Sequence, residues 1–128
     1  MNKTYLITAA VLGAISVMLG AFGAHGLKTR MNPEAFDIFE TAVKYQFYHV
    51  FALLAVAIVS QFIPGNFINW SGRCFIAGII IFCGSLYLLS YFKMVGNQQM
   101  NWLGAVTPFG GLFFITGWIL LAVAAIKK

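Results

Sequence analysis

The stretch TYLITAAVLGAISVMLGAFGAHGL, residues 4–27, decides the fold class of this chain, because it contains no Asp, Glu, Lys or Arg. At about 1.5 Å of rise per residue, a helix of this length crosses a hydrocarbon core of about 30 Å. We therefore predict a first transmembrane helix here. A cleavable signal peptide is the alternative, since Lys3 precedes the stretch, but the stretch is long for such a peptide.

A second helix is predicted over residues 33–63. Asn32 can cap it, proline stands at its first position, and acidic residues fall in its first turns, where the helix dipole favours them. This first part is amphipathic and should lie at the membrane interface, with Glu40 and Lys44 spaced for an ion pair. No helix breaker intervenes before the Pro-Gly pair at 64–65, so the same helix should continue across the bilayer.

Two further crossings follow. The third is predicted over residues 74–92, after a turn with polar and aromatic residues. The fourth is predicted over residues 108–126, because Thr107 can cap a helix whose first position is Pro108. Residues 102–106 would then form an apolar hook before it.

Composition supports a membrane protein with a single domain, residues 1–128. Hydrophobic residues make up 61% of the chain and charged residues 9%, and the mean hydropathy is +0.87. A soluble domain of this size needs more charge to cover its surface. The predicted fold is an all-α, four-transmembrane-helix bundle, with an amphipathic interfacial helix before the second crossing and both termini on one side of the cell membrane.

The net charge of +5 does not indicate a nucleic-acid partner, because the basic residues are scattered at segment ends instead of forming a patch. They anchor the helices at the lipid headgroups. Their distribution does not decide the orientation of the protein in the membrane, because each side carries four basic residues and the cytoplasmic side normally carries more. If Lys44 is left out of the count because its long side chain can snorkel from within a helix, the side with the termini becomes the cytoplasmic one. The terminal side carries Lys3, Arg73, Lys127 and Lys128, and the other side carries Lys28, Arg30, Lys44 and Lys93.

Cys74 and Cys83 lie in one apolar run at a spacing that places them on opposite helix faces. They should not form an intrachain disulfide. Buried thiols behave as small apolar groups, so we interpret both as packing residues and not as redox or copper ligands.

Polar side chains near one predicted membrane face are the candidate site. His25 ends the first helix and His49 enters the second, so a helical hairpin could make them neighbours. Ionisable groups at membrane depth are costly, which raises a functional hypothesis. Helical spacing lets neighbours of His49 share its face. The candidate cluster comprises His25, Glu40, Tyr45, Gln46, His49 and Tyr87.

Three roles are open for this cluster. Its members can tie helices together by hydrogen bonds worth about 0.6 kcal/mol each in membranes. They can handle a proton or a small polar solute. Binding of a metal by His25, His49 and Glu40, or of haem between the two histidines, is the third, but the chain has no zinc-enzyme spacing. No metal or cofactor is therefore predicted.

Small residues recur at spacings of three and four along the first helix, which lets another helix approach closely. Packing within the bundle is the favoured interpretation, and a self-association face is the alternative. The first helix carries Ala9, Gly13, Ser16, Gly20 and Ala24 in this pattern. The predicted packing glycines are Gly13, Gly20, Gly23, Gly84, Gly110, Gly111 and Gly117.

Several fragments together resemble a widespread family of small four-helix membrane proteins of unknown function, which includes the bacterial YgdD and YwdK proteins and a related eukaryotic branch. Cys83 departs from the family, whose members often carry a small polar residue there. The resemblance implies a four-helix inner-membrane protein and supplies no activity, cofactor or catalytic residue. It rests on residues 20–27 (GAFGAHGL), Tyr45-Gln46 with His49, residues 84–87 (GSLY), Leu103-Gly104, Thr107-Pro108, Gly110-Gly111 and Gly117-Trp118.

Catalysis is not expected, because no nucleophile with a neighbouring base and no phosphate-binding glycine motif can be assembled. The three carboxylates fall on one predicted surface stretch. We expect a noncatalytic scaffold or accessory subunit that packs on itself, on lipid or on a partner membrane protein. The alternatives are a carrier or channel lined by the His/Gln/Tyr cluster, which would require oligomers, and a histidine-ligated metal or haem protein.

Overall fold

The computed structural model describes residues 2–128, and within this range it contains helices and turns but no strand. Four continuous helical rods are each long and apolar enough to cross a membrane, so the prediction of a four-helix membrane bundle is confirmed. Two rods include a wide π-helical turn. The elements are α1 (Lys3–Phe22), η1 (Gly23–Leu27), α2 (Pro33–Val59), α3 (Asn66–Gly78), η2 (Ile79–Cys83), α4 (Gly84–Met94), η3 (Gln98–Met100) and α5 (Leu103–Ile126).

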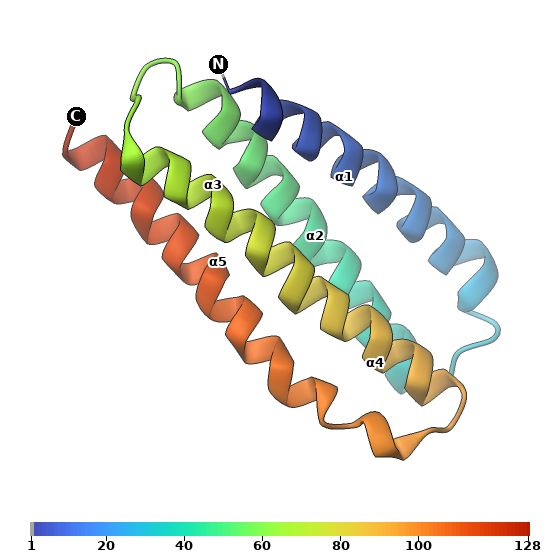
Figure 1. Cartoon of the computed structure of the whole chain (residues 1–128). Helices are drawn as coiled ribbons and strands as arrows, with labels where there is room; N and C mark the ends of the chain where they lie inside the picture. The colour runs from blue at the N-terminus through green and yellow to red at the C-terminus, as the bar shows by residue number, and fades with distance from the viewer. Residues whose placement is uncertain (1) are drawn as a thin grey trace.

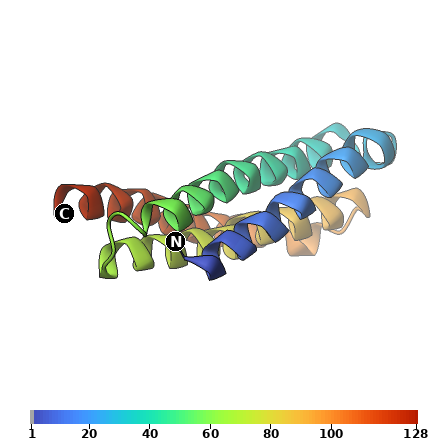
Figure 2. The same ribbon diagram turned by 90° about the horizontal axis from the view of Figure 1, so that it is seen from above.

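The rods run side by side, with α1 packed on α2 and α5 packed on α3 and η2 (Figure 1). The rod formed by α3, η2 and α4 also packs on α2. These two rods, α2 and α3–η2–α4, form the centre of the bundle, and α1 and α5 flank them. Both termini lie at one end of the bundle (Figure 1). The view from above in Figure 2 shows the same long rods stacked beside each other. More of the central rods than of α1 and α5 is buried within the chain.

The predicted interfacial segment forms the first turns of α2 and is not a separate helix. Asn32 caps it as expected, because its Oδ1 accepts a hydrogen bond of 2.8 Å from the amide of Ala35. The ion pair expected between Glu40 and Lys44 does not form. Instead, Lys93 at the end of α4 lies with its Nζ 3.0 Å from Glu34. This pair ties the amphipathic start of α2 to the α4 rod.

Two helix ends near the terminal side differ from the prediction. The second helix ends at Val59 and not at residue 63, because the chain tightens into a turn at Ser60, whose Oγ donates to Ala57 O at 2.8 Å. The third begins at Asn66 and not at residue 74. Gly65 has φ +147°, a backbone conformation that residues other than glycine rarely adopt, and it lets the new helix start eight residues earlier than its apolar run.

The fourth helix begins at Leu103, so the expected hook over residues 102–106 is mostly helical. Pro108 lies inside the helix and not at its first position. Thr107 is therefore not a cap. Its hydroxyl lies 2.7 Å from Ser85 Oγ and 3.3 Å from Leu103 O, which fits the general pattern that hydroxyl side chains stabilise proline-containing membrane helices.

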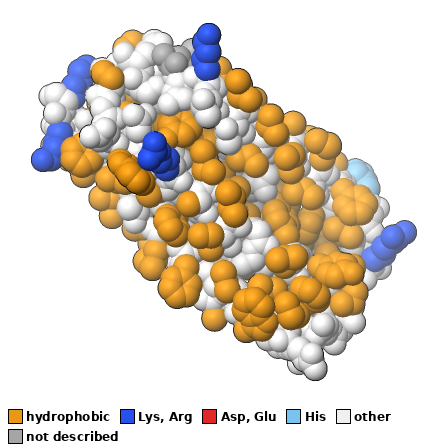
Figure 3. Space-filling model, viewed as in Figure 1, with side chains coloured by type: hydrophobic (Ala, Val, Ile, Leu, Met, Phe, Trp, Pro, Cys, Tyr) orange, Lys and Arg blue, Asp and Glu red, His pale blue; other side chains and the backbone are white. Residues whose placement is uncertain are grey.

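Both cysteines are buried and free, as the spacing predicted. Hydrophobic side chains form a broad belt around the face of the bundle shown in Figure 3, and basic side chains lie towards the ends. This pattern fits a protein whose middle contacts lipid and whose ends contact headgroups.

Candidate functional site

His49 lies at the centre of the bundle and is 5% exposed. It lies roughly 15 Å from the end of α2 at about 1.5 Å per residue, which is near the middle of a core of about 30 Å. Its imidazole stacks on the ring of Phe114 from α5, with 3.5 Å between ring centroids and 9° between planes. Phe75 from α3 lies 5.8 Å away between centroids. Three helices therefore enclose one ionisable side chain with aromatic rings.

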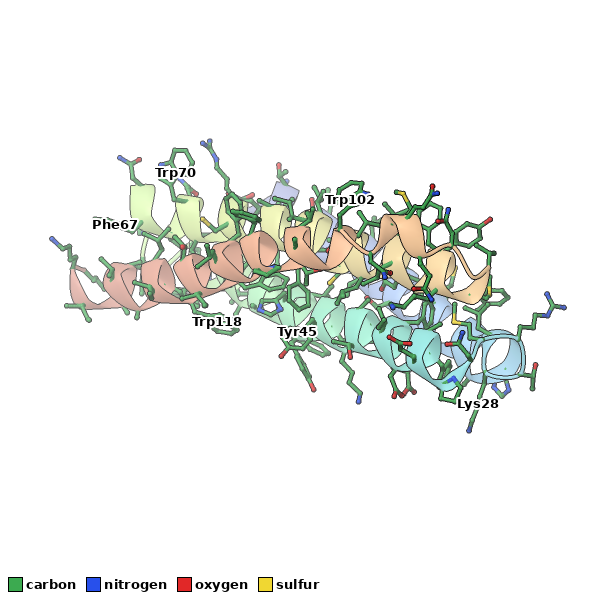
Figure 4. All side chains as sticks on the ribbon, turned by 90° about the horizontal axis from the view of Figure 1, so that it is seen from below. Lys28, Tyr45, Phe67, Trp70, Trp102 and Trp118 are labelled. Atoms are coloured by element: carbon green, nitrogen blue, oxygen red, sulfur yellow. The ribbon has the colours of Figure 1, made fainter. Side chains whose placement is uncertain are left out.

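Both ring nitrogens of His49 have partners. Trp118 Nε1 lies 3.2 Å from His49 Nε2, and His49 Nδ1 lies 2.8 Å from Tyr45 O. The indole N–H can only donate and the carbonyl can only accept. We therefore assign the neutral tautomer with the proton on Nδ1. Figure 4 shows Trp118 and Tyr45 on the same side of the bundle. The Nε2 lone pair, which a metal or haem iron would need, is occupied by Trp118.

Gln46, which lies one turn before His49 on α2, makes a second set of polar contacts, with α1 and α4 instead of α5. Its Nε2 donates to Leu12 O of α1 at 3.2 Å, and its Oε1 accepts a bond of 2.7 Å from Tyr87 Oη of α4. Gln46 is 3% exposed, so breaking either bond would leave a buried polar atom unpaired. One side chain therefore links α1, α2 and α4.

The structure does not bring the six candidate residues into one cluster. Gln46 and Tyr87 form one pair, and His49 contacts α5, while the ring of Tyr45 packs on Phe82 of η2. His25 and Glu40 are exposed. Because Asn2 N bonds Ala57 O at 3.1 Å, the start of α1 lies level with the end of α2, and His25 is roughly 20 Å from His49 along the bundle at about 1.5 Å per residue.

This separation bears on the metal, haem and carrier hypotheses. The first two require His25 and His49 to face one ion or one porphyrin, and they do not in this arrangement. Among residues 2–128, no three His, Cys, Asp or Glu side chains gather as they would around a metal ion. The path expected from His25 past His49 and Tyr87 is likewise interrupted, because His49 bonds Trp118 of α5 whereas Tyr87 bonds Gln46 next to α1.

Three glycines, Gly78, Gly110 and Gly117, allow α5 to approach α3 and η2 closely. We call this contact the α5 seam. A Cβ on Gly110 would meet the backbone of Phe82. A Cβ on Gly117 would lie 2.7 Å from the ring of Phe75, and one on Gly78 would overlap Phe114. Gly117 O also accepts a bond of 2.7 Å from Ser71. An alanine at any of these three positions would force the facing residues or the helices themselves to move apart.

The α1 seam, formed by Gly13 and Gly20 facing α2, is looser. A Cβ on Gly13 would lie 3.4 Å from Val50, and one on Gly20 would lie 3.7 Å from Val43, both near ordinary van der Waals contact. The seam tightens only at its η1 end, where a Cβ on Gly23 would come within 2.6 Å of Phe39. Within the small-residue stripe of α1, Ala9 and Ser16 are buried against the rest of the chain, whereas Ala24 is exposed.

Not all predicted packing glycines pack. A Cβ on Gly84 would meet nothing within 4 Å, and one on Gly111 would make ordinary contact with Phe82 at 3.9 Å. Conversely, Gly72 was missed, although a Cβ on it would lie 2.5 Å from the ring of Tyr5. Sequence reasoning missed it because the start of α3 was taken for a turn. Trp118 and Phe114 were also missed, and their spacing of four along α5 was the available signal.

Comparison with known proteins identifies relatives along the whole chain. A family model described as "Protein of unknown function (DUF423)" matches residues 19–111. The UPF0382 membrane protein YwdK of Bacillus subtilis is 39% identical, over 98% of each chain. The UPF0382 membrane protein SAUSA300_0565 of Staphylococcus aureus is 42% identical over 98% of this chain and 97% of its own. No solved structure matches. The chain belongs to the DUF423 family of UPF0382 membrane proteins, whose function is unknown.

Proposed function

We propose that this protein is a noncatalytic scaffold or accessory subunit of the cell membrane. Its core is rigid, and its outer helices pack against a partner protein, a second copy or lipid. One observation carries the proposal. The buried side chains of Gln46 and His49 at the centre are committed to contacts between helices, and α1 and α5 are the rods least buried within the chain, so we assign interaction to their outward faces.

The polar contacts support this proposal because they join every neighbouring pair of rods. Gln46 joins α2 to α1 and α4, and His49 joins α2 to α5. Ser71 joins α3 to α5. Tyr5 Oη donates to Asn69 O at 2.6 Å and joins α1 to α3. Each bond is worth only about 0.6 kcal/mol in a membrane, but together they fix the register of the helices.

The outer surface gives the second line of support. Large apolar side chains on α1 and α5 point away from the chain, and in a bilayer they face either lipid or another protein. Such faces are where a membrane partner can pack without displacing buried groups. Examples are Val11, Val17 and Met18 on α1, and Leu112, Ile115 and Ile119 on α5.

Photocrosslinking in native membranes tests the proposal. A photoreactive residue at Val17 or Ile115, which are 59% and 56% exposed, would probe the two outer faces. Phe51 on α2 is the matched control, since it is 62% exposed but belongs to a central rod. The proposal predicts a protein product of discrete mass, or selective capture of one lipid class, from at least one outer face and neither from Phe51. Identical diffuse labelling from all three positions would contradict it.

A further inference from the structure

Charge is divided unevenly between the two ends of the bundle. Lys3, Arg73 and the two final lysines lie at the terminal end. All three acidic residues of the sequence, Glu34, Asp37 and Glu40, lie in the first turns of α2 at the opposite end. The terminal end thus carries basic side chains with no Asp or Glu, whereas at the opposite end carboxylates offset most of the basic charge.

A groove of ≈ 450 Å³ opens at this terminal end, between the turn that links α2 to α3 and the last turn of α5. Lys127 and Lys128 line one side, and Lys127 Nζ lies 5.8 Å from the centroid of the Phe67 ring. The remaining lining is mostly apolar and includes Ile63, Ile68 and Ala124. The groove therefore combines two cations with a mostly apolar wall.

Aromatic residues place this groove at the headgroup level. Phe67 and Trp70 are exposed at the same end of the bundle (Figure 4), and Arg73 stacks over the Trp70 ring with 4.7 Å from Cζ to the centroid. Exposed tryptophans and basic side chains of this kind mark the boundary between hydrocarbon and headgroups. A ligand that enters the groove from the membrane meets its lysines at the depth of the lipid phosphates.

We propose that this groove binds one anionic phospholipid, with the phosphate at Lys127 and Lys128 and the upper part of an acyl chain against Ile63 and Phe67. Charge complementarity carries the assignment, because anionic headgroups are attracted to basic side chains at the surface and the surrounding surface contributes no competing carboxylate side chain. The inference deepens the proposed function, since it names the lipid class that one surface of the scaffold holds.

Native mass spectrometry of the full chain, released from nanodiscs made of phosphatidylglycerol and phosphatidylcholine, tests this inference. We expect the wild-type protein to retain phosphatidylglycerol in preference to phosphatidylcholine. The double variant Lys127→Gln, Lys128→Gln should lose this preference by roughly thirtyfold, or about fivefold for each lysine. The matched control Lys28→Gln, Arg30→Gln removes two basic side chains from the opposite end and should change it by less than about twofold.

Further arms of the experiment separate the alternatives. Soluble glycerol phosphate should not displace the retained lipid, because it lacks the acyl chain; displacement would overturn the lipid assignment. Loss of a dimer mass and not of lipid in the double variant would assign the groove to a second copy. An equal loss in both variants would mean diffuse attraction without a site. These readouts do not depend on crosslinking from Val17 or Ile115, so either proposal can fail alone.

Discussion

The α5 seam and the α1 seam are both lined by small residues at helical spacing, yet only the α5 seam requires glycine along its length. In the α5 seam, a methyl group on Gly110 or Gly117 collides with the backbone of Phe82 or the ring of Phe75. In the α1 seam, a methyl group on Gly13 or Gly20 makes near-ordinary contact with valine. Small-residue spacing therefore identifies where helices meet but not how closely they approach.

The same difference extends to the polar contacts. The α5 seam lies beside His49, Phe114 and Trp118, which stack and hydrogen-bond across three helices. Beside the α1 seam, Gln46 spans the contact with one bond to Leu12 O. We infer that the packing of α5 against the centre tolerates less change than the packing of α1 does.

The largest effect is expected from Gly110→Ala. The atoms that it meets are the backbone N and Cα of Phe82, which cannot rotate away, so the helices must separate. We expect a loss of about 3 kcal/mol in the free energy of unfolding, the upper end for overpacking. SDS titration in mixed micelles, followed by tryptophan fluorescence, measures it. Gly111→Ala is the control, and an equal loss in both variants would remove the case for close approach.

A direct comparison of the seams comes next. Gly117→Ala should cost about 1 to 2 kcal/mol, because the obstructing Phe75 ring is fully buried and can adjust only slightly. Gly20→Ala should change the free energy of unfolding by less than about 0.5 kcal/mol, and in the stabilising direction if helix propensity dominates. The same SDS titration reports both. Similar losses in the two variants would show that the seams are equivalent.

The side-chain hydrogen bond between α2 and α4 should give a smaller effect. In a double-mutant cycle with Gln46→Leu and Tyr87→Phe, we expect a coupling energy of about 0.6 kcal/mol, the average for such bonds in membranes. Thr41→Val, at an exposed hydroxyl of α2 that bonds only its own helix, should show no coupling to Tyr87→Phe. A coupling near zero for the first pair would mean that the bond of 2.7 Å between the two side chains does not tie the helices.

Gly84→Ala should have the smallest effect, because a Cβ at this position meets nothing within 4 Å. We expect the free energy of unfolding to change by less than about 0.5 kcal/mol. A loss above about 1 kcal/mol, the scale of overpacking, would reveal a neighbour in the membrane that the isolated chain does not contain. Blue native electrophoresis of the same variant would show whether an assembly is lost.

Much of the fold could be predicted from the sequence because long apolar runs and the Asn32 cap depend on local chemistry. The starts of α3 and α5 could not, since they depend on the positive φ of Gly65 and on tertiary contacts of Thr107. For the candidate site, the Tyr45–His49 face followed from helical spacing. Its partner Trp118 comes from a distant helix, and a sequence without the three-dimensional arrangement does not reveal which helix faces His49.

The most direct test of the central claim, that His49 is a closed structural contact and not a ligand or a proton carrier, is ¹⁵N NMR of its imidazole in nanodiscs. The account predicts a neutral ring with the proton on Nδ1, an Nε2 signal that changes in Trp118→Phe, and no change on addition of Zn²⁺. A ring that exchanges its proton rapidly with water, or an Nε2 signal that shifts on metal addition, would contradict the account and return His49 to the functional candidates.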